Sequence, residues 1–165
     1  MTAAGLRAEV VAVGTELVQG LIGDTNSAWV SEQLASVGIP TDYHTCVGDE
    51  AERLEAVVRL AASRSDLVII TGGLGPTADD ITREVVARAA GRTLVLHQAS
   101  LDEIAARFAK WHRTMSENNR SQAYLPEGAR VLPNASGTAP GFDITIDRAR
   151  VFVFPGVPAE LHDMF

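Results

Sequence analysis

Short apolar runs alternate along the chain with segments whose apolar residues recur at helical spacing. The runs 8–13 and 66–71 are short, rich in β-branched residues and nearly all apolar, which is typical of strands buried on both faces of a sheet. A further strand is predicted over 39–47. Between these strands, 24–38 and 49–64 carry apolar residues three or four positions apart, so each predicts a helix with one buried face.

The second half of the chain continues the same alternation. Helices are predicted over 78–90 and 98–113, with a short strand over 93–96 between them. The polar stretch 116–129 predicts irregular structure with a helix only at its start, and closing strands are predicted within 130–156. Strand and helix alternation with short connections predicts a three-layer α/β/α sandwich around a mostly parallel sheet.

Composition narrows the class of protein. A length of 165 residues and a hydrophobic content of 46% fit one domain, 1–165, that buries about two-thirds of its surface. The net charge of −7, with scattered Arg residues, argues against a nucleic-acid partner. No apolar run approaches the roughly 18 residues that span a bilayer, so no membrane partner is expected. The single Cys46, interpreted as a small apolar residue at a strand end, and the lack of an export signal predict a cytoplasmic protein.

The predicted architecture places the candidate site. In open α/β sheets, ligands bind beyond the carboxyl ends of the strands. The segments that follow the predicted strands are 14–16, 48–50, 71–80 and 155–158, and they are rich in glycines and carboxylates. If the strands are parallel, all four segments lie at the same edge of the sheet.

The glycine-rich turn at 72–75 is the strongest local signal. Its glycines allow a ligand to approach the backbone closely, and Thr77 is expected to cap the following helix, whose free N–H groups attract an anion such as phosphate. The alternative is a tight turn that needs glycine for its shape alone. The turn follows the third strand rather than the first, which argues against a dinucleotide fingerprint, and no P-loop pattern occurs.

Two adjacent carboxylates, Asp79 and Asp80, follow the turn. Acids in the first turn of a helix are favoured by its dipole by about 0.3–1 kcal/mol each, which gives them a structural explanation. Next to a phosphate site, however, they would repel the ligand unless a divalent cation lay between them, and Mg²⁺ is commonly held by one or two carboxylates plus phosphate oxygens. Asp49 and Glu16 could supply further ligands or orient water. This arrangement predicts attack at a phosphoryl group.

A set of motifs resembles one known family. The stretches VGTEL, GDTN, VGDE, TGGLGPTADDIT, ENNRSQA, GTAPGF and PGVPAEL occur in the order and spacing of the N-terminal domain of the CinA proteins, within the molybdopterin-binding fold of MogA and MoaB. The resemblance covers essentially the whole chain. For CinA-like members it implies a metal-dependent pyrophosphatase acting on ADP-ribose and related compounds. For MogA-like members it implies adenylylation of molybdopterin.

The resemblance also assigns residues. It implies that Asp49 and Asp80 are the catalytic acidic pair, whereas the carboxylates beside the phosphate turn assign the metal to Asp79 and Asp80. Arg120 is either a phosphate partner or a solvated loop residue. The substrate and phosphate contacts that we expect are Gly14, Thr15, Glu16, Thr71, Gly72, Gly73, Gly75, Pro76, Thr77, Asn119, Arg120, Ser136, Gly137, Thr138, Ala139, Pro140, Gly141, Pro155 and Gly156.

Three functions stay open from the sequence. The first is hydrolysis of an ADP-ribose-like nucleotide with Mg²⁺, Mn²⁺ or Co²⁺ and K⁺ as candidate ions, the second is adenylyl transfer to molybdopterin, and the third is a non-catalytic module that binds a pterin or nucleotide. Where MogA-type sequences have a Thr and an Arg, this chain has Leu74 and Asp79, which favours the first. The resemblance implies a homo-oligomer, a dimer or trimer. The chain stops at Phe165, inside a helix predicted to begin near Pro158, as a truncated or a stand-alone domain would.

Overall fold

The computed structural model describes residues 5–165. Its strands are β1 (Ala8–Val13), β2 (Thr41–Val47), β3 (Leu67–Thr71), β4 (Leu94–Leu96), β5 (Tyr124–Pro126), β6 (Arg130–Leu132), β7 (Gly141–Ile146) and β8 (Ala149–Phe154). Its helices are α1 (Thr15–Val18), α2 (Thr25–Ser36), α3 (Ala51–Arg64), α4 (Thr82–Ala89), α5 (Gln98–Lys110), α6 (Glu117–Ser121) and α7 (Pro158–Met164).

The main sheet has six strands in the order β2-β1-β3-β8-β7-β6. The strands β2, β1, β3 and β8 pair in parallel, whereas β7 and β6 join in antiparallel fashion. The tight link between β7 and β8 explains this change of direction, since a parallel pair needs a longer crossover connection. The prediction of a mostly parallel sheet flanked by helices is confirmed.

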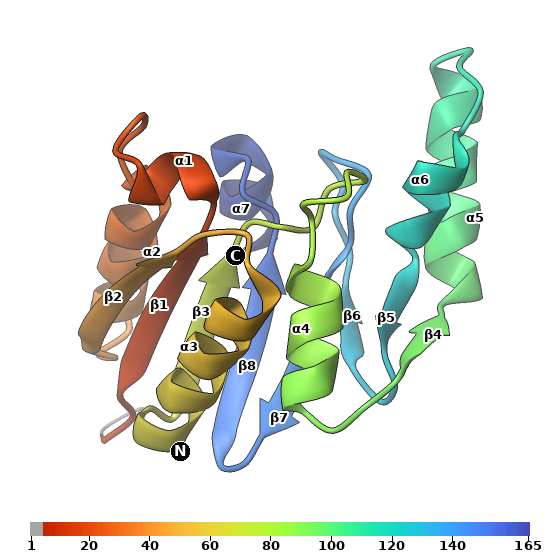
Figure 1. Ribbon diagram of the computed structural model, residues 1–165. Helices are drawn as coiled ribbons and strands as arrows, with labels where there is room; N and C mark the ends of the chain where they lie inside the picture. The colour runs from red at the N-terminus through yellow and green to blue at the C-terminus, as the bar shows by residue number, and fades with distance from the viewer. Residues whose placement is uncertain (1–4) are drawn as a thin grey trace.

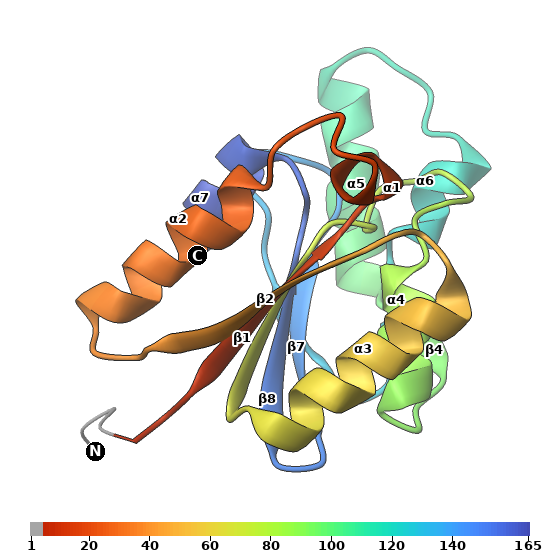
Figure 2. The same ribbon diagram turned by 60° about the vertical axis from the view of Figure 1, so that its left-hand side comes forward.

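Helices cover both faces of this sheet, so the domain has three layers. On one face, α2 and α7 pack over a cluster that contains Val10, Val30, Ile69 and Leu161. On the other face, α3 and α4 lie side by side over a larger cluster that contains Phe142. Figure 2 shows the sheet between the two groups of helices. All six residues of β1 are buried, as predicted for a strand covered on both faces.

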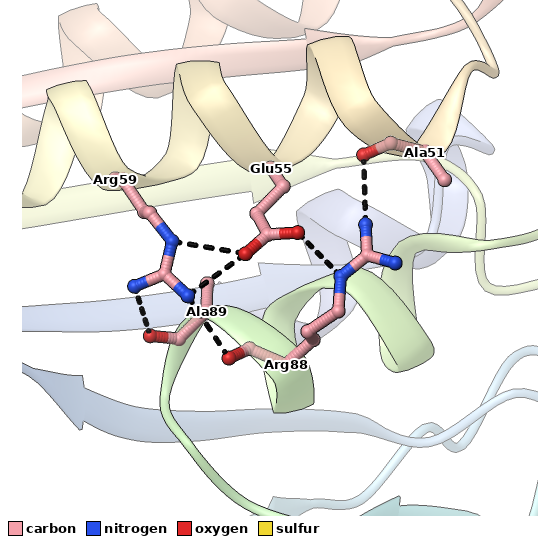
Figure 3. Close-up of polar contacts among 5 residues, drawn as sticks. All are labelled: Ala51, Glu55, Arg59, Arg88 and Ala89. Carbon is pink, nitrogen blue, oxygen red and sulfur yellow. Dashed lines mark hydrogen bonds and ion pairs between the residues drawn. The ribbon is translucent and has the colours of Figure 1, made fainter.

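A polar network ties α3 to α4 (Figure 3). Glu55 on α3 accepts hydrogen bonds from Arg59 one turn further along, at 2.8 and 2.9 Å, and forms an ion pair with Arg88 on α4. Arg59 donates in turn to the carbonyl oxygens of Ala89 and Arg88, at 3.1 and 3.2 Å. Because Ala89 ends α4, the bond from Arg59 satisfies a carbonyl group that lacks a helical partner, while the Arg88 carbonyl also accepts from the Gly91 N–H. The network therefore fixes the end of α4 against α3.

A smaller unit lies beside the main sheet. The strands β4 and β5 form an antiparallel pair, and α5 packs over a separate apolar cluster that includes Leu101, Ile104 and Ala123. The short strand near 93–96 is confirmed, whereas β5 falls in the stretch predicted to be irregular. The hydrophobic pattern does not predict this strand because Tyr124–Pro126 has only three residues and ends in a proline.

The predicted helix over 78–90 begins later than expected. It starts at Thr82, so Asp79 and Asp80 lie in the preceding loop and Thr77 is not its cap. The expectation of a Thr77 cap is therefore wrong. The reason is that Asp80 uses both carboxylate oxygens to hold the 75–77 backbone, which keeps these residues out of the helix.

The described residues bear on two further expectations. Cys46 lies near the end of β2 but is exposed rather than buried, because β2 is the edge strand of the sheet. No helix within residues 5–165 is long and apolar enough to cross a membrane.

Candidate functional site

The loops after the four parallel strands meet at one edge of the sheet, at the top in Figure 1. They enclose an open cavity of about 520 Å³, a size typical of small-molecule sites. Its walls come from the ends of β1, β2, β3 and β8 and from segments before β7 and at α7. The lining residues are Val13, Gly14, Glu16, Asp49, Gly72, Gly73, Leu74, Gly75, Pro76, Thr77, Asp79, Asp80, Gln122, Thr138, Ala139, Pro155, Gly156, Val157 and Glu160.

The glycines of the turn are required by close packing. Gly72 has a φ of +101°, and a side chain there would collide with the carbonyl oxygen of Val13 at the end of β1. Gly73 has a φ of +67° and presses against the side chain of Thr82, whose hydroxyl donates to the Gly72 carbonyl at 2.9 Å. The turn thus lies tightly between β1 and the start of α4, at the floor of the cavity.

Two backbone donors of the turn, on residues that line the cavity, have no acceptor within the described part of the chain. The Gly72 N–H bonds to the Phe154 carbonyl, at 3.0 Å, but no described residue accepts from the N–H groups of Gly73 or Leu74. Successive free N–H groups in a turn with positive φ form a concave anion site. This arrangement supports the interpretation of the glycine turn as an anion-binding element.

Asp80 organises the rest of the loop. Its Oδ1 accepts from the Gly75 N–H at 2.8 Å, while Oδ2 accepts from the N–H and the hydroxyl of Thr77 at 2.8 and 2.6 Å. A side chain at Gly75 would lie only 2.5 Å from the Asp80 carboxylate, so the glycine is what lets the carboxylate close over the loop. Asp80 therefore has a structural role as well as a place in the cavity wall.

Arg83, in the first turn of α4, holds the same loop from behind. Its guanidinium donates to the carbonyl oxygens of Leu74 at 2.6 Å and Gly75 at 3.3 Å, and the residue is only 6% exposed. Burial lowers the pKa of Arg83, while the charges of Asp80 and Glu84 act against that shift. Sequence reasoning gave no role to this residue.

Asp49 lies at the end of β2 and points to the neighbouring β1 loop. Its Oδ2 accepts from both the N–H and the hydroxyl of Thr15, each at 2.9 Å. No described residue donates to Oδ1, so that oxygen remains available to a ligand. Thr15 therefore positions the carboxylate and does not itself line the cavity.

The side chains that line the cavity carry negative charge only. Five carboxylate residues line the cavity, and no Lys or Arg does. Within residues 5–165, no three His, Cys, Asp or Glu side chains are grouped so as to bind a metal unaided. The donor set suits a hard cation such as Mg²⁺ that completes its shell with waters and ligand phosphates, with Asp79, Asp80 or Asp49 as the protein's oxygen donors.

The other expected contacts divide into two groups. The cavity wall includes Thr138, Ala139, Pro155 and Gly156, and the amide of Asn26 holds the Gly156 carbonyl at 2.9 Å. The remaining expected contacts lie outside the wall. Thr71 is buried at the end of β3, and Pro140 and Gly141 are buried at the start of β7. Asn134 accepts from the N–H groups of Ser136 and Gly137, and Asn119 and Arg120 lie on α6. Asn119 forms a capping box with Ser116, and Arg120 lies 3.7 Å from Glu117.

Sequence reasoning missed two polar residues of the wall. Gln122 is 1% exposed and donates to the Leu74 carbonyl at 3.5 Å, and Glu160 on α7 accepts from the Asn134 amide at 2.7 Å. Both fall inside stretches already singled out, ENNRSQA and PGVPAEL, so the motifs contained the signal. What the sequence could not show is that these stretches reach the glycine turn.

An α/β/α domain with an acidic pocket around a glycine turn defines the class of protein, and comparison with known proteins identifies the family. The family model described as "Probable molybdopterin binding domain" matches residues 9–165. The chain belongs to this family. Among curated relatives, the competence-damage inducible proteins of Geobacillus sp. strain WCH70 and of Bacillus subtilis strain 168 are 48% and 47% identical over 97% and 96% of this chain. The chain spans 38% of the length of each.

Solved structures agree with this placement. The CinA protein of unknown function from Thermoplasma acidophilum superposes with a TM-score of 0.88 and 32% identity, over 95% of this chain and 92% of that one. The molybdopterin biosynthesis enzyme MoaB from Thermus thermophilus gives a TM-score of 0.65 and 21% identity, over 96% and 86% of the two chains. The second likeness shows the shared fold. The predicted resemblance to CinA proteins, within the fold of MogA and MoaB, is confirmed.

Proposed function

We propose that this domain binds a phosphorylated nucleotide and, with a divalent cation, hydrolyses the phosphoanhydride bond of an ADP-ribose-like substrate. The observation that carries the proposal is the pairing of free backbone donors at Gly73 and Leu74 with five carboxylates in one cavity. Donors of this kind bind an anion, yet the carboxylates repel it. A divalent cation bridging the two resolves this conflict, and phosphate esters are the common ligands bound in that way.

The chain's own residues then have distinct roles. The turn at 72–74 holds phosphate oxygens, and Asp80 keeps the adjoining loop at 75–77 in shape. Asp49, fixed by Thr15 through one oxygen, offers Oδ1 to orient and deprotonate the attacking water. When bound, the cation offsets negative charge that develops at the phosphoryl group.

The two carboxylates make unequal probes of this function. In Asp49→Asn, the amide oxygen can still accept from Thr15 while the NH₂ group takes the free position, so the change removes charge and little else. In Asp80→Asn, an NH₂ group must face the N–H of Gly75 or Thr77, so the loop loses at least one hydrogen bond. Asp49→Asn is therefore the cleaner probe of charge, because Asp80→Asn also disturbs the loop at 75–77.

The test is release of AMP and ribose 5-phosphate from ADP-ribose by the purified chain, with and without Mg²⁺, Mn²⁺ or Co²⁺ and with K⁺. We expect metal-dependent release that falls by a factor of about 10² to 10⁴ in Asp49→Asn, the usual contribution of a general base. Thermal melting checks that the variant folds, and Asn118→Ala on exposed α6 is the control. A folded wild-type chain without turnover under any of these ions would refute the proposal.

A second candidate function follows from the family model. Its description as a probable molybdopterin binding domain supports a pterin ligand, with or without adenylyl transfer from ATP. Leu74 argues against the transfer reaction, because its side chain is 1% exposed and offers the cavity no hydroxyl. Product analysis with ATP and molybdopterin separates the two functions, since adenylylated pterin would form only in the second.

A further inference from the structure

A buried cation lies directly behind the glycine turn. Arg83 is 6% exposed, and no described carboxylate approaches its nitrogens within ion-pair distance. Its bonds go to neutral carbonyl oxygens of Leu74 and Gly75 instead. Buried charges in proteins are normally paired, so an Arg satisfied by carbonyls alone requires an explanation.

The position of Arg83 is unfavourable in a second way. It occupies the first turn of α4, where the helix dipole favours anions and disfavours cations. A charged residue that is both desolvated and placed against the dipole lowers the stability of the fold. Residues that lower stability in this way are concentrated at functional sites.

The contacts show what this cation does to the turn. By binding the carbonyls of Leu74 and Gly75, Arg83 turns two negative dipole ends away from the cavity, while Asp80 draws the N–H groups of Gly75 and Thr77 toward itself. The peptide units that carry the N–H groups of Gly73 and Leu74 are held by Thr82 through the carbonyls of Gly72 and Gly73, and no described residue accepts from these two N–H groups. The cavity wall holds no Lys or Arg, and Arg83 places a positive charge directly behind two of its residues, Leu74 and Gly75.

We infer that Arg83 is a positioning residue that also supplies the electrostatic attraction for the ligand's phosphate groups, acting through the backbone of the turn without touching the ligand. This inference rests on the proposed function in so far as the ligand is a phosphate ester. It adds that anion affinity depends on the charge of a residue outside the cavity wall. A charge in such a low-dielectric position acts over several ångströms with little screening.

Two substitutions separate charge from hydrogen bonding. Both Arg83→Lys and Arg83→Gln lose the planar fork that reaches two carbonyls, but only the lysine keeps the positive charge. We expect Arg83→Gln to weaken the binding of inorganic pyrophosphate, measured by calorimetry with Mg²⁺ present, at least about tenfold, and Arg83→Lys to retain most of the wild-type affinity. Arg92→Gln, an exposed arginine beyond α4, is the matched control and should bind like wild type.

A purely structural role gives a different result, because both variants would then lose affinity together and in proportion to their loss of melting temperature. That outcome, or wild-type affinity in Arg83→Gln, overturns the inference. If Arg83→Gln does not fold, Arg83→Lys alone decides the question, since a folded lysine variant with tenfold weaker binding contradicts the role of charge. Absence of pyrophosphate binding by the wild type also overturns it. Binding without turnover of ADP-ribose would refute the proposed hydrolysis and leave this inference standing.

Discussion

At the scale of single residues, the site depends on a few positions where the backbone has no room for a side chain. Gly72 combines a positive φ with direct contact to the end of β1, whereas Gly20 has a similar φ of +72° but open space around it. Alanine substitutions at these two positions therefore distinguish backbone strain, expected at both, from steric collision, expected only at Gly72.

We expect Gly72→Ala to lower the free energy of unfolding by about 2 kcal/mol or more, because strain of about 1–2 kcal/mol adds to a collision with the Val13 carbonyl. Gly20→Ala should show only the strain. Urea unfolding of both variants measures the difference, and pyrophosphate binding should weaken in Gly72→Ala alone. Equal losses of stability would show that the close packing of the turn against β1 contributes nothing.

At the scale of elements, α3 and α4 are held together by Glu55 and its two arginines. The hydrogen bond from Arg59, followed by the charge of Arg88, lowers the pKa of Glu55 below its usual value of 4.5. A carboxylate with a lowered pKa stabilises the folded state fully above its unfolded-state pKa, and that stabilisation is lost as the pH falls through the folded-state value.

Glu55→Gln should therefore melt at a lower temperature than wild type at neutral pH, and the difference should shrink below about pH 4 as Glu55 becomes protonated. Melting curves of both proteins between pH 2 and 7, a range set by the carboxylate pKa values, test this. Glu103→Gln, at an exposed position on α5, is the control. A difference that stays constant with pH would show that packing of the side chain, not its charge, connects the helices.

At the scale of the whole molecule, stability is expected to be uneven. The central strands β1, β3 and β8 lie between two apolar clusters, whereas β4 and α5 pack on a small separate cluster; Leu125 of β5 belongs to the larger one. Local opening requires least free energy where few apolar contacts are lost. We expect backbone amides of β4 and α5 to exchange with deuterium about tenfold faster, or more, than those of β1 and β3. Mass spectrometry of peptic fragments measures this, and uniform protection across both units would contradict it.

Some of the site was visible in the sequence because it lies in contiguous motifs. The buried runs at 8–13 and 66–71 predicted parallel strands correctly, and the rule that ligands bind beyond strand ends brought Asp49, Gly72 and Asp80 to one edge. The late start of α4 could not be predicted, since Asp79 and Asp80 suit a helix N-terminus equally well by pattern.

The sequence by itself determined the order of the longer strands and helices, the family, and the loops that form the cavity, because periodicity, turn residues and motif spacing are local properties of the chain. Only the tertiary structure decided which side chains meet there. The placement of Gln122 and Glu160 in the wall, and of Arg83 behind the turn, depends on contacts between residues up to dozens of positions apart. Such contacts arise when the sheet forms and the helices pack, so a local motif can single out a stretch but cannot show which of its side chains meet the others.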